Sequence, residues 1–411
     1  MRKNIAIIGG GAAGMMTAAR ITEVAPEAKV VLFEKNPGLG SKVIISGGGR
    51  CNVTTGIEHV REVLKRYYRG GKFLTSAMWN FPPADVYAWF EDHGVPLKIE
   101  EDMRVFPASN KGEDVVGVFE RLFKESGVDV RLKTSVESVS RADDGFVIEV
   151  EGKKEKFDAV ILTTGGQAYR HTGSTGDGYT FSEALGHTIT PLAASLNAFV
   201  LAEEWMHETP GVSFTDIEMT VAGNTTQHAR GPIVCTHTGI SGPAVFALSA
   251  QVAFEEYSKE NPLAMYIDWL PDESEQGFRQ KLDNACRATP KNMLTRFLQE
   301  WLPKSMAVQL LKAANVDQDS ILAEVSKQMR IDVVQYIKKS EVRIIGRSAG
   351  SEFVTAGGVD TNEIDPRTMQ SRITPGLFFA GELMNVDGVT GGFNLQASWA
   401  AGRLAGESSV E

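Results

Sequence analysis

A short apolar run that ends in a glycine-rich turn, NIAIIGGGAAG at residues 4–14, restricts the fold of this chain more than any other stretch. The apolar run predicts a buried strand, and the alanine-rich residues 12–21 predict a helix directly after it. Gly9, Gly11 and Gly14 occupy the glycine positions of the GxGxxG pattern. Gly9 allows the tight turn, Gly11 lets the backbone approach a pyrophosphate, and Gly14 lets helix and strand pack closely. The stretch therefore predicts the first strand, turn and helix of a dinucleotide-binding domain.

An acidic residue at the end of the next predicted strand completes this pattern. Residues 29–33 are mostly apolar, and Glu34 stands 20 residues after Gly14, at the expected distance. Its carboxylate can accept hydrogen bonds from both ribose hydroxyls and would repel a 2′-phosphate. The helix N-terminus at Ala12 and Ala13 favours the negative charge of a phosphate. NAD and FAD domains share this signature, so these residues alone leave the choice between the two cofactors open.

A second unit of strand, glycine loop and helix lies near the other end of the chain. Residues 376–380 predict a buried strand that leads to Glu382, and residues 394–404 predict a helix. An NAD domain does not need such a unit, whereas the ribityl chain and ring of FAD extend beyond the adenylate half. Glu382 can hold a ribityl hydroxyl, and backbone N–H groups near Asn394 and Leu395 can stabilise the charge of a reduced flavin. The second unit therefore favours FAD.

Three stretches between these ends predict further contacts with the same cofactor. The loop SGGGRCNVTT at residues 46–55 follows the acid of the second strand, and its glycines let the chain pass the pyrophosphate and the ring. A strand at 158–162 leads into TTGG, and a strand at 136–139 stands where an adenine contact is usual. Cys51 has no second cysteine nearby, so we interpret it as a packing or ring contact. The predicted FAD contacts are Gly9, Gly11, Ala12, Ala13, Gly14, Glu34, Lys35, Lys42, Ser46, Gly47, Gly48, Gly49, Arg50, Cys51, Asn52, Val136, Thr164, Gly165, Gly166, Gly381, Glu382, Gly392, Asn394 and Leu395.

The overall composition of the chain indicates which partners other than a dinucleotide are expected. A net charge of −10 disfavours nucleic acid or an anionic membrane as the main partner, although a local basic patch is compatible with an acidic total. The three cysteines are far apart and odd in number, which fits a reducing cytoplasm. No uninterrupted apolar run reaches the length of about 18 residues that a membrane span needs. The seven histidines show no metal-ligand spacing, so no metal is expected, and the oligomeric state stays open.

The middle of the chain has a different character. Residues from about 191 to 345 lack dinucleotide motifs, and the segments 217–221 and 263–267 predict strands. Apolar residues then recur at helical spacing, and Pro290 and Pro303 predict helix starts. We therefore expect three domains: an FAD-binding domain at 1–190 and 345–411, an inserted β-barrel-like substrate domain at 191–272 and 331–344, and a helical domain at 273–330.

Several motifs together resemble the bacterial BaiN-like (YhiN-like) family of NAD(P)/FAD-dependent oxidoreductases. They occur in the family's order over nearly the whole chain: IAIIGGGAAG, SGGGRCNVTT, RVFPASNK, TTGGQAY, TGSTGDGY, THTGISGPA, VTAGGV and PGLFFAGELMNVDGVTGGFNLQ. The resemblance implies an α/β fold, with a Rossmann-like FAD domain of the glutathione-reductase type, an inserted β-barrel-like domain and a small helical domain. Met103, Asn385 and the pair Arg170–His171 depart from the family's usual residues, so the substrate of any relative does not transfer directly.

The function expected from these features is that of an FAD-dependent oxidoreductase that transfers a hydride between flavin N5 and a small organic substrate. NAD(P)H is a candidate transient reductant, because only one complete dinucleotide fold is present. Three residues are catalytic candidates: Arg104 for binding a substrate anion or the charge of the reduced flavin, His171 for proton transfer, and His237 because its glycine-rich loop in the insertion can reach the flavin. For each, a structural or surface role is the alternative. Two other functions stay open: a flavin-dependent RNA-modifying protein and a noncatalytic FAD-binding regulator.

Overall fold

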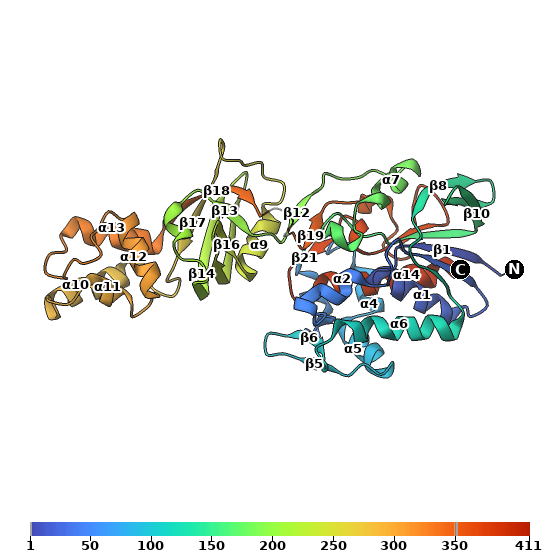
Figure 1. Ribbon diagram of the computed structural model, residues 1–411, viewed down its shortest axis with the longest axis horizontal. Helices are drawn as coiled ribbons and strands as arrows, with labels where there is room; N and C mark the ends of the chain where they lie inside the picture. The colour runs from blue at the N-terminus through green and yellow to red at the C-terminus, as the bar shows by residue number, and fades with distance from the viewer. Residues whose placement is uncertain (1, 349, 351) are drawn as a thin grey trace. The chain divides into compact units, whose positions relative to one another are not determined.

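The computed structural model describes residues 2–348, 350 and 352–411, and the chain folds as two compact units. The first, here called the Rossmann unit, comprises Met1–Ser195 and Phe353–Glu411. The second, here called the insertion unit, comprises Leu196–Glu352. Each unit has its own hydrophobic core and is described by itself (Figure 1).

A five-stranded parallel sheet forms the centre of the Rossmann unit. Its strand order is β20-β11-β1-β2-β7, so the first strand of the chain lies in the middle. The strands are β1 (Asn4–Ile8), β2 (Lys29–Phe33), β7 (Asp129–Arg131), β11 (Ala159–Leu162) and β20 (Leu377–Phe379). Nearly every residue of β1, β2, β11 and β20 is buried, which explains their continuous apolar runs.

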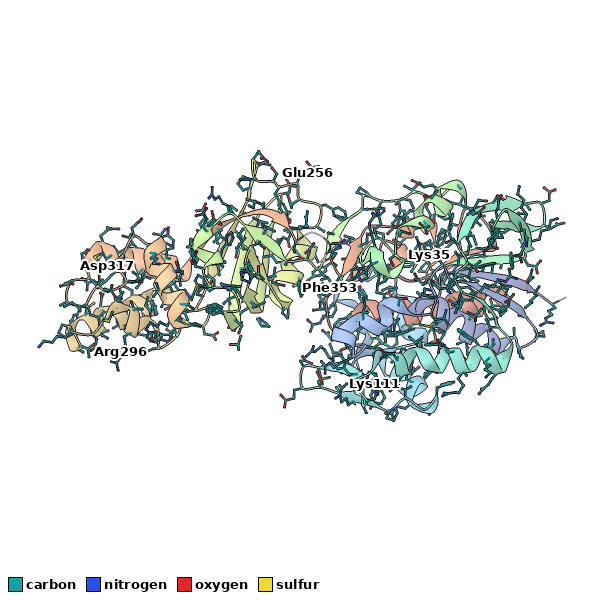
Figure 2. The ribbon with its side chains drawn as sticks, viewed as in Figure 1. Lys35, Lys111, Glu256, Arg296, Asp317 and Phe353 are labelled. Carbon is teal, nitrogen blue, oxygen red and sulfur yellow. The ribbon has the colours of Figure 1, made fainter. Side chains whose placement is uncertain are left out.

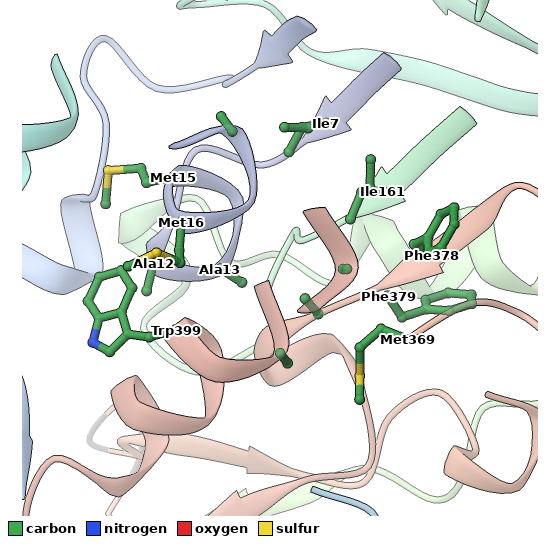
Figure 3. Packing of buried hydrophobic residues seen from close by; sticks show 14 of the residues in the cluster. Ile7, Ala12, Ala13, Met15, Met16, Ile161, Met369, Phe378, Phe379 and Trp399 are labelled. Atoms are coloured by element: carbon green, nitrogen blue, oxygen red, sulfur yellow. The ribbon is translucent and has the colours of Figure 1, made fainter. Parts of the chain in front are cut away.

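Two helices from opposite ends of the sequence pack on this sheet. They are α1 (Ala12–Val24) and α14 (Phe393–Val410), and α6 (Gly112–Ser126) lies beside α1 (Figure 1). Gly402 allows the close approach, since a Cβ atom there would lie 2.4 Å from the carbonyl oxygen of Ala13. Figure 3 shows the resulting core, in which side chains of α1 and Trp399 of α14 meet those of β1, β11 and β20.

The other elements of the Rossmann unit build its smaller sheets and surface helices. An antiparallel sheet, β10-β9-β8, lies on the side of the main sheet away from α1 (Figure 1). Three short sheets have the orders β3-β6-β5, β21-β4 and β12-β19. The strands are β3 (Thr54–Thr55), β4 (Tyr67–Arg69), β5 (Leu97–Ile99), β6 (Arg104–Pro107), β8 (Val136–Ala142), β9 (Gly145–Val150), β10 (Lys153–Phe157), β12 (Ala193–Ser195), β19 (Val354–Ala356) and β21 (Asp387–Gly388). The helices are α2 (Ser41–Ile45), α3 (Val60–Leu64), α4 (Thr75–Asn80), α5 (Pro83–Asp92) and α7 (Asp177–Ala184).

The insertion unit combines a closed barrel with a helical part. The barrel has the order β13-β16-β15-β14-β17-β18. Its strands are β13 (Phe199–Leu201), β14 (Ser213–Ala222), β15 (Thr226–Cys235), β16 (Gly239–Ser241), β17 (Leu263–Asp268) and β18 (Ser340–Arg347), accompanied by α8 (Glu204–His207) and α9 (Pro243–Gln251). The helical part consists of α10 (Glu275–Ala288), α11 (Leu294–Leu298), α12 (Lys304–Ala313) and α13 (Lys327–Lys338). One continuous core joins the barrel and the helices.

The fold class predicted from the sequence is confirmed, including the inserted barrel and the helical part. The helix start predicted at Pro303 is correct, because α12 begins with the next residue. The start predicted at Pro290 is wrong: α10 ends before Thr289, and the next helix begins at Leu294. Pro290 lies in the connection, where its carbonyl oxygen accepts a hydrogen bond from the backbone N–H of Ala323. The division into three domains by residue number stays a prediction.

In the part of the chain that the structure describes, no helix combines the length and the apolar character needed to cross a lipid bilayer.

Candidate functional site

The N-terminus of α1 is open to a ligand. Gly9 has a φ of +108° and turns the chain after β1, and a Cβ at Gly14 would lie only 1.9 Å from the carbonyl oxygen of Gly9. No side chain caps the helix, and a Cβ added at Gly11 would meet no atom within 4 Å. The first backbone N–H groups of α1, at Ala12 and Ala13, therefore lack a side-chain acceptor. This combination of uncapped N–H groups and free space is what an anionic phosphate requires.

The carboxylate of Glu34 stands beside this turn. Its Oε2 accepts a hydrogen bond of 2.7 Å from the N–H of Gly10, and its Oε1 accepts one of 2.8 Å from the N–H of Asn36. Both bonds fix the side chain at the end of β2, directly next to the phosphate-binding turn. Because each carboxylate oxygen has further lone pairs, Glu34 can also accept hydrogen bonds from ribose hydroxyls.

A second loop is tied to the chain just after Glu34. Lys35 Nζ donates to Thr175 and, at 2.6 Å, to Asp177 at the start of α7 (Figure 2). Burial is the largest single influence on the Asp177 carboxyl and opposes its ionisation, but the hydrogen bonds from Lys35 and Thr175 and the charge of Lys35 together lower its pKa. Asn36 Nδ2 donates to the carbonyl oxygen of Thr172 at 2.8 Å. The segment 170–177 is therefore held next to Glu34.

A second carboxylate lies where the C-terminal glycine unit meets α1. A Cβ at Gly381 would lie 3.0 Å from the Cβ of Ala13, so this turn contacts the first turn of α1. The next residue, Glu382, accepts hydrogen bonds of 2.9 Å from Lys42 Nζ and from the N–H of Thr355. Gly166 lies against the same group, since a Cβ there would be 2.9 Å from Glu382 Oε1. Glu34 and Glu382 are thus both linked to the start of α1.

The loop after α2 has the backbone that its glycines predicted. Gly47, Gly48 and Gly49 have φ values of +57°, +72° and +87°, and a Cβ at either of the last two would meet nothing within 4 Å. Ser46 begins this turn, and its carbonyl oxygen accepts from the N–H of Cys51 at 2.9 Å. The turn therefore presents bare backbone to open space.

Residues 50–52 anchor this loop to β6. The guanidinium of Arg50 lies 3.8 Å from the ring centroid of Phe106 and pairs with Glu100 at 2.7 Å. Asn52 is buried, and its Oδ1 accepts from the N–H of Val105. Burial raises the pKa of the Cys51 thiol to about 12, which keeps it protonated at ordinary pH and argues against a thiolate nucleophile.

The N-terminus of α14 is a second uncapped helix start. Gly392 precedes the helix with a φ of +92°, and no side chain caps it. A Cβ at Gly392 would lie 2.3 Å from the carbonyl oxygen of Thr54, so this start is adjacent to β3. The Asn394 side chain donates to the carbonyl oxygen of Gly388 and accepts from its N–H, which closes the preceding loop, and Leu395 packs against the core.

These features fit an extended dinucleotide such as FAD. The open α1 N-terminus suits a pyrophosphate, while Glu34 and Glu382 offer acceptors for hydroxyl groups on either side of it. Thr164 Oγ1 and Asn385 Oδ1 are two of the buried side-chain atoms that have no hydrogen-bond partner among the described residues. Gly165, between Thr164 and Gly166, has a φ of +75°. Val136 begins β8, in the antiparallel sheet, and its contact with adenine stays a prediction.

The three candidate catalytic residues occupy different places. Arg104 begins β6, pairs with Asp102 at 2.6 Å and Glu100 at 3.4 Å, and is partly exposed. His171 lies in the turn held by Asn36, with its ring 5.6 Å from that of Tyr169. His237 belongs to an exposed loop of the insertion unit. The structure brings Arg104 close to the Arg50 loop through the shared Glu100, and the catalytic roles of all three stay predictions.

Two groups in the Rossmann unit were missed by sequence reasoning. Thr355 joins two loops, because its Oγ1 accepts from the N–H groups of Gln167 and Ala168 while its own N–H donates to Glu382. Asp387 is fully buried, pairs with Arg69 and accepts from Ser195 Oγ at 2.8 Å. The motif VTAGGV contains Thr355, but only the folded chain shows its partners.

Within the described residues, no group of three His, Cys, Asp or Glu side chains gathers as a metal site would.

The chain matches a known protein family and is similar to several known proteins over almost its whole length. A family model described as "HI0933-like protein Rossmann domain" matches residues 3–408. The chain is 28% identical to a 3-dehydro-bile acid delta(4,6)-reductase from Clostridium scindens, over 99% of both chains. It is 29% identical to a ribosomal RNA dihydrouridine synthase from Haemophilus influenzae, over 96% of this chain and 95% of that one. The crystal structure of a 3-ketosteroid delta1-dehydrogenase from Sterolibacterium denitrificans is similar in fold, with a TM-score of 0.52 at 12% identity and full coverage of both chains.

Proposed function

Because the family match spans almost the whole chain, the protein belongs to the HI0933-like Rossmann family and is an FAD-dependent oxidoreductase, and we propose that it reduces a carbon–carbon double bond conjugated to a carbonyl group. The structural support is the α1 N-terminus, which lies uncapped beside Glu34 and the turn at Gly381. One extended cofactor would meet all of these groups.

The two full-length relatives named above share this chemistry. A 3-dehydro-bile acid with double bonds at positions 4 and 6 is a conjugated ketone. Formation of dihydrouridine adds two hydrogens to a double bond that is conjugated to a carbonyl of the uracil ring. In both cases the hydride adds at the carbon far from the carbonyl, negative charge develops on the carbonyl oxygen, and a proton completes the reduction. The shared chemistry, rather than either substrate, is what we transfer to this chain.

The residues present fit roles in such a reaction. FAD, when bound, supplies the hydride at N5 of its ring. Glu34 would hold the ribose, the start of α1 the pyrophosphate, and Glu382 a ribityl hydroxyl. Backbone N–H groups at the start of α14 would stabilise negative charge on the ring. Arg104 would stabilise the charge that develops on the carbonyl oxygen of the substrate.

NAD(P)H is the proposed electron donor, acting transiently. We expect a small organic substrate and a cytoplasmic location. The second candidate function is the same reduction on a uracil base of RNA, which the similarity to the dihydrouridine synthase favours.

Anaerobic absorbance spectroscopy tests the proposed function. Purified protein with bound flavin is mixed with NADPH or NADH, and bleaching of the visible flavin band is followed. The reduced protein is then mixed with a steroid 4-en-3-one, with uridine-containing RNA or with buffer. We expect rapid bleaching by a nicotinamide, followed by reoxidation with one of the conjugated compounds.

The saturated 3-ketosteroid is the matched control, since it lacks the double bond and should not reoxidise the flavin. Arg104→Gln should retain FAD but slow reoxidation by about tenfold or more, and Lys124→Gln on α6 is the control for a lost exposed positive charge. Reduction by amines alone, with turnover under oxygen and none with conjugated ketones or RNA, would refute the proposed reaction while leaving FAD binding intact.

A further inference from the structure

The helical part of the insertion unit has a charge opposite to that of the whole chain. Residues 273–339 contain eleven Lys and Arg against eight Asp and Glu, a net charge of +3, so the other residues together carry −13. The contrast is strongest from Lys281 to Lys304, where five cationic residues face two acidic ones. This stretch covers the C-terminal half of α10, the following connection and α11. A locally positive surface on an acidic protein indicates an anionic partner.

A cavity of about 720 Å³ opens within the same stretch. Its wall combines cations, side-chain amides and rings: Lys281, Asn284, Asn292, Arg296, Gln299 and Trp301. Glu300 is the one acidic residue in the wall. Most of these polar side chains are exposed, so they can reach a ligand from solvent.

Trp301 forms an aromatic platform in this cavity. Its ring packs edge-on against Phe278 and Phe297, with centroid distances of 5.4 and 5.1 Å, and it remains partly exposed. The ammonium group of Lys281 lies 5.6 Å from the ring centroid and is also paired with Glu273. The indole is therefore packed against two rings, and the ammonium group of Lys281 lies over its ring.

Arg296 supplies a positive charge without a counter-ion. It is exposed on α11, at the end of the helical part labelled in Figure 2. Among the described residues, no carboxylate forms a salt bridge with it. By contrast, Arg330 and Lys338 of the same helical part pair with Asp283 and Asp268. An unpaired guanidinium next to an aromatic platform and several amides is suited to a phosphate with a base attached.

We propose that this cavity binds one nucleotide of a single-stranded RNA. Arg296 and Lys281 contact the phosphate, Trp301 stacks on the base, and the amides of Asn284 and Gln299 contact the base edges. RNA is favoured over a free nucleotide because further cations extend the positive surface beyond the cavity. Arg287 and Lys291 stand in sequence between its wall residues, and both are exposed.

The choice of RNA rests on the second candidate function, reduction of a uracil base of RNA, and binding is measured without turnover. The probe is a fluorescein-labelled single-stranded oligouridine of about ten nucleotides, and fluorescence anisotropy is recorded with the intact flavoprotein over a range of salt concentrations. Arg296→Gln should weaken binding about three- to tenfold and reduce the steepness of the logarithmic salt dependence by about 0.7. Lys281→Gln should weaken binding less, because the ammonium group of Lys281 is already paired with Glu273.

Lys312→Gln on α12 is the matched control, since it removes the same charge from an exposed residue of the helical part that does not line the cavity. It should leave binding unchanged. If Lys312→Gln and Arg296→Gln weaken RNA binding equally, the binding depends on the overall charge of the helical part and not on the cavity, and the site is refuted. If uridine monophosphate competes as strongly as the unlabelled oligomer, the ligand of the cavity is a free nucleotide and not RNA.

Failure of this proposal and failure of the proposed function are distinguishable. No RNA binding by the wild-type protein, together with reduction of a conjugated ketone, refutes only the RNA site. RNA binding that depends on Arg296, without any conjugated reduction, supports the site and refutes the proposed reaction. In every variant, the FAD content and the rate of bleaching by NAD(P)H serve as the measure of an intact protein.

Discussion

The candidate sites of the two units are made from different parts of the polypeptide. The candidate FAD site of the Rossmann unit is largely backbone: positive-φ glycines at Gly9 and Gly47–Gly49, and the open N-termini of α1 and α14. The cavity of the insertion unit is built from side chains on α10, on α11 and on the connecting segments next to them. A site made of backbone constrains residue identity strongly, because only glycine fits, whereas a site made of side chains leaves no comparable pattern in the sequence.

The largest effect is expected from a substitution in the site that is made of backbone. Gly14→Val places a side chain where even a Cβ would lie 1.9 Å from the carbonyl oxygen of Gly9, so α1 can no longer pack on the turn. We expect the Rossmann unit to lose its cooperative thermal transition and its flavin. Circular dichroism and flavin absorbance measure both.

Gly117→Ala in α6 is the control, because a Cβ at that position meets nothing within 4 Å. It should stabilise the unit slightly, by about 0.5–1 kcal/mol. Normal melting and flavin content in Gly14→Val would disprove the close approach of α1 to the turn.

The second prediction compares ion pairs of the two units. Asp387→Ala removes a fully buried carboxylate that pairs with Arg69 and accepts a hydrogen bond from Ser195 Oγ inside the Rossmann unit. The expected loss in free energy of unfolding is about 3–5 kcal/mol, measured by urea denaturation. Arg230→Gln in the barrel breaks exposed pairs with Asp216 and Asp272 and should change little, since solvent already screens them. Equal losses in free energy of unfolding for the two variants would contradict the expected difference between the buried and the exposed ion pairs.

The third prediction separates the fold from the cofactor. Gly11→Ala introduces a methyl group into space that the chain itself leaves open, so the melting temperature should stay close to that of the wild type. A bound pyrophosphate would meet the methyl group, and the affinity for FAD should fall about tenfold or more, or at least 1.4 kcal/mol. Titration of apoprotein with FAD measures the loss. Gly346→Ala in β18 of the insertion unit is the control and should leave the affinity for FAD unchanged. If Gly11→Ala binds FAD as tightly as the wild type, the pyrophosphate does not bind at the N-terminus of α1.

The smallest expected effect concerns a buried histidine. His187 donates or accepts hydrogen bonds with Glu363 and Ser371, and burial lowers the pKa of its imidazole although Glu363 opposes the shift. The folded chain therefore keeps His187 neutral while the unfolded chain takes up a proton near pH 6.5. This contribution is present above pH 6.5 and is lost as the pH falls below it. Urea unfolding above and below this pH checks it. His187→Gln should flatten the dependence, and His237→Gln, at an exposed site of the insertion unit, should not.

The same contrast explains how much the sequence could predict. The glycines at 9, 11 and 14 and the acid at 34 each have a fixed place in the strand–turn–helix, so local spacing was sufficient for them. The start of α12 after Pro303 was equally local. The glycines and Pro303 act on neighbours only a few residues away, and Glu34 is identified by its spacing of 20 residues from Gly14.

Features that depend on distant partners could not be predicted in this way. Thr355 acquires its role through Gln167 and Glu382, and Asp387 through Arg69, which lie far away in the sequence. The apparent helix start at Pro290 failed for the same reason, because a contact with Ala323 keeps that segment in a loop. Whole-chain net charge also hid the basic stretch of α10 and α11, although a charge count over shorter windows would have found it.

The central sheet receives β20 and its covering helix α14 from the segment that follows the insertion unit. During synthesis, a ribosome releases β1, α1 and β2 long before these partners exist, so the apolar face of α1 stays uncovered in the nascent chain. The barrel and its helices, whose strands all lie between residues 199 and 347, are complete earlier. Folding of the Rossmann unit is therefore expected to finish only after the last helix has emerged, later than folding of the insertion unit.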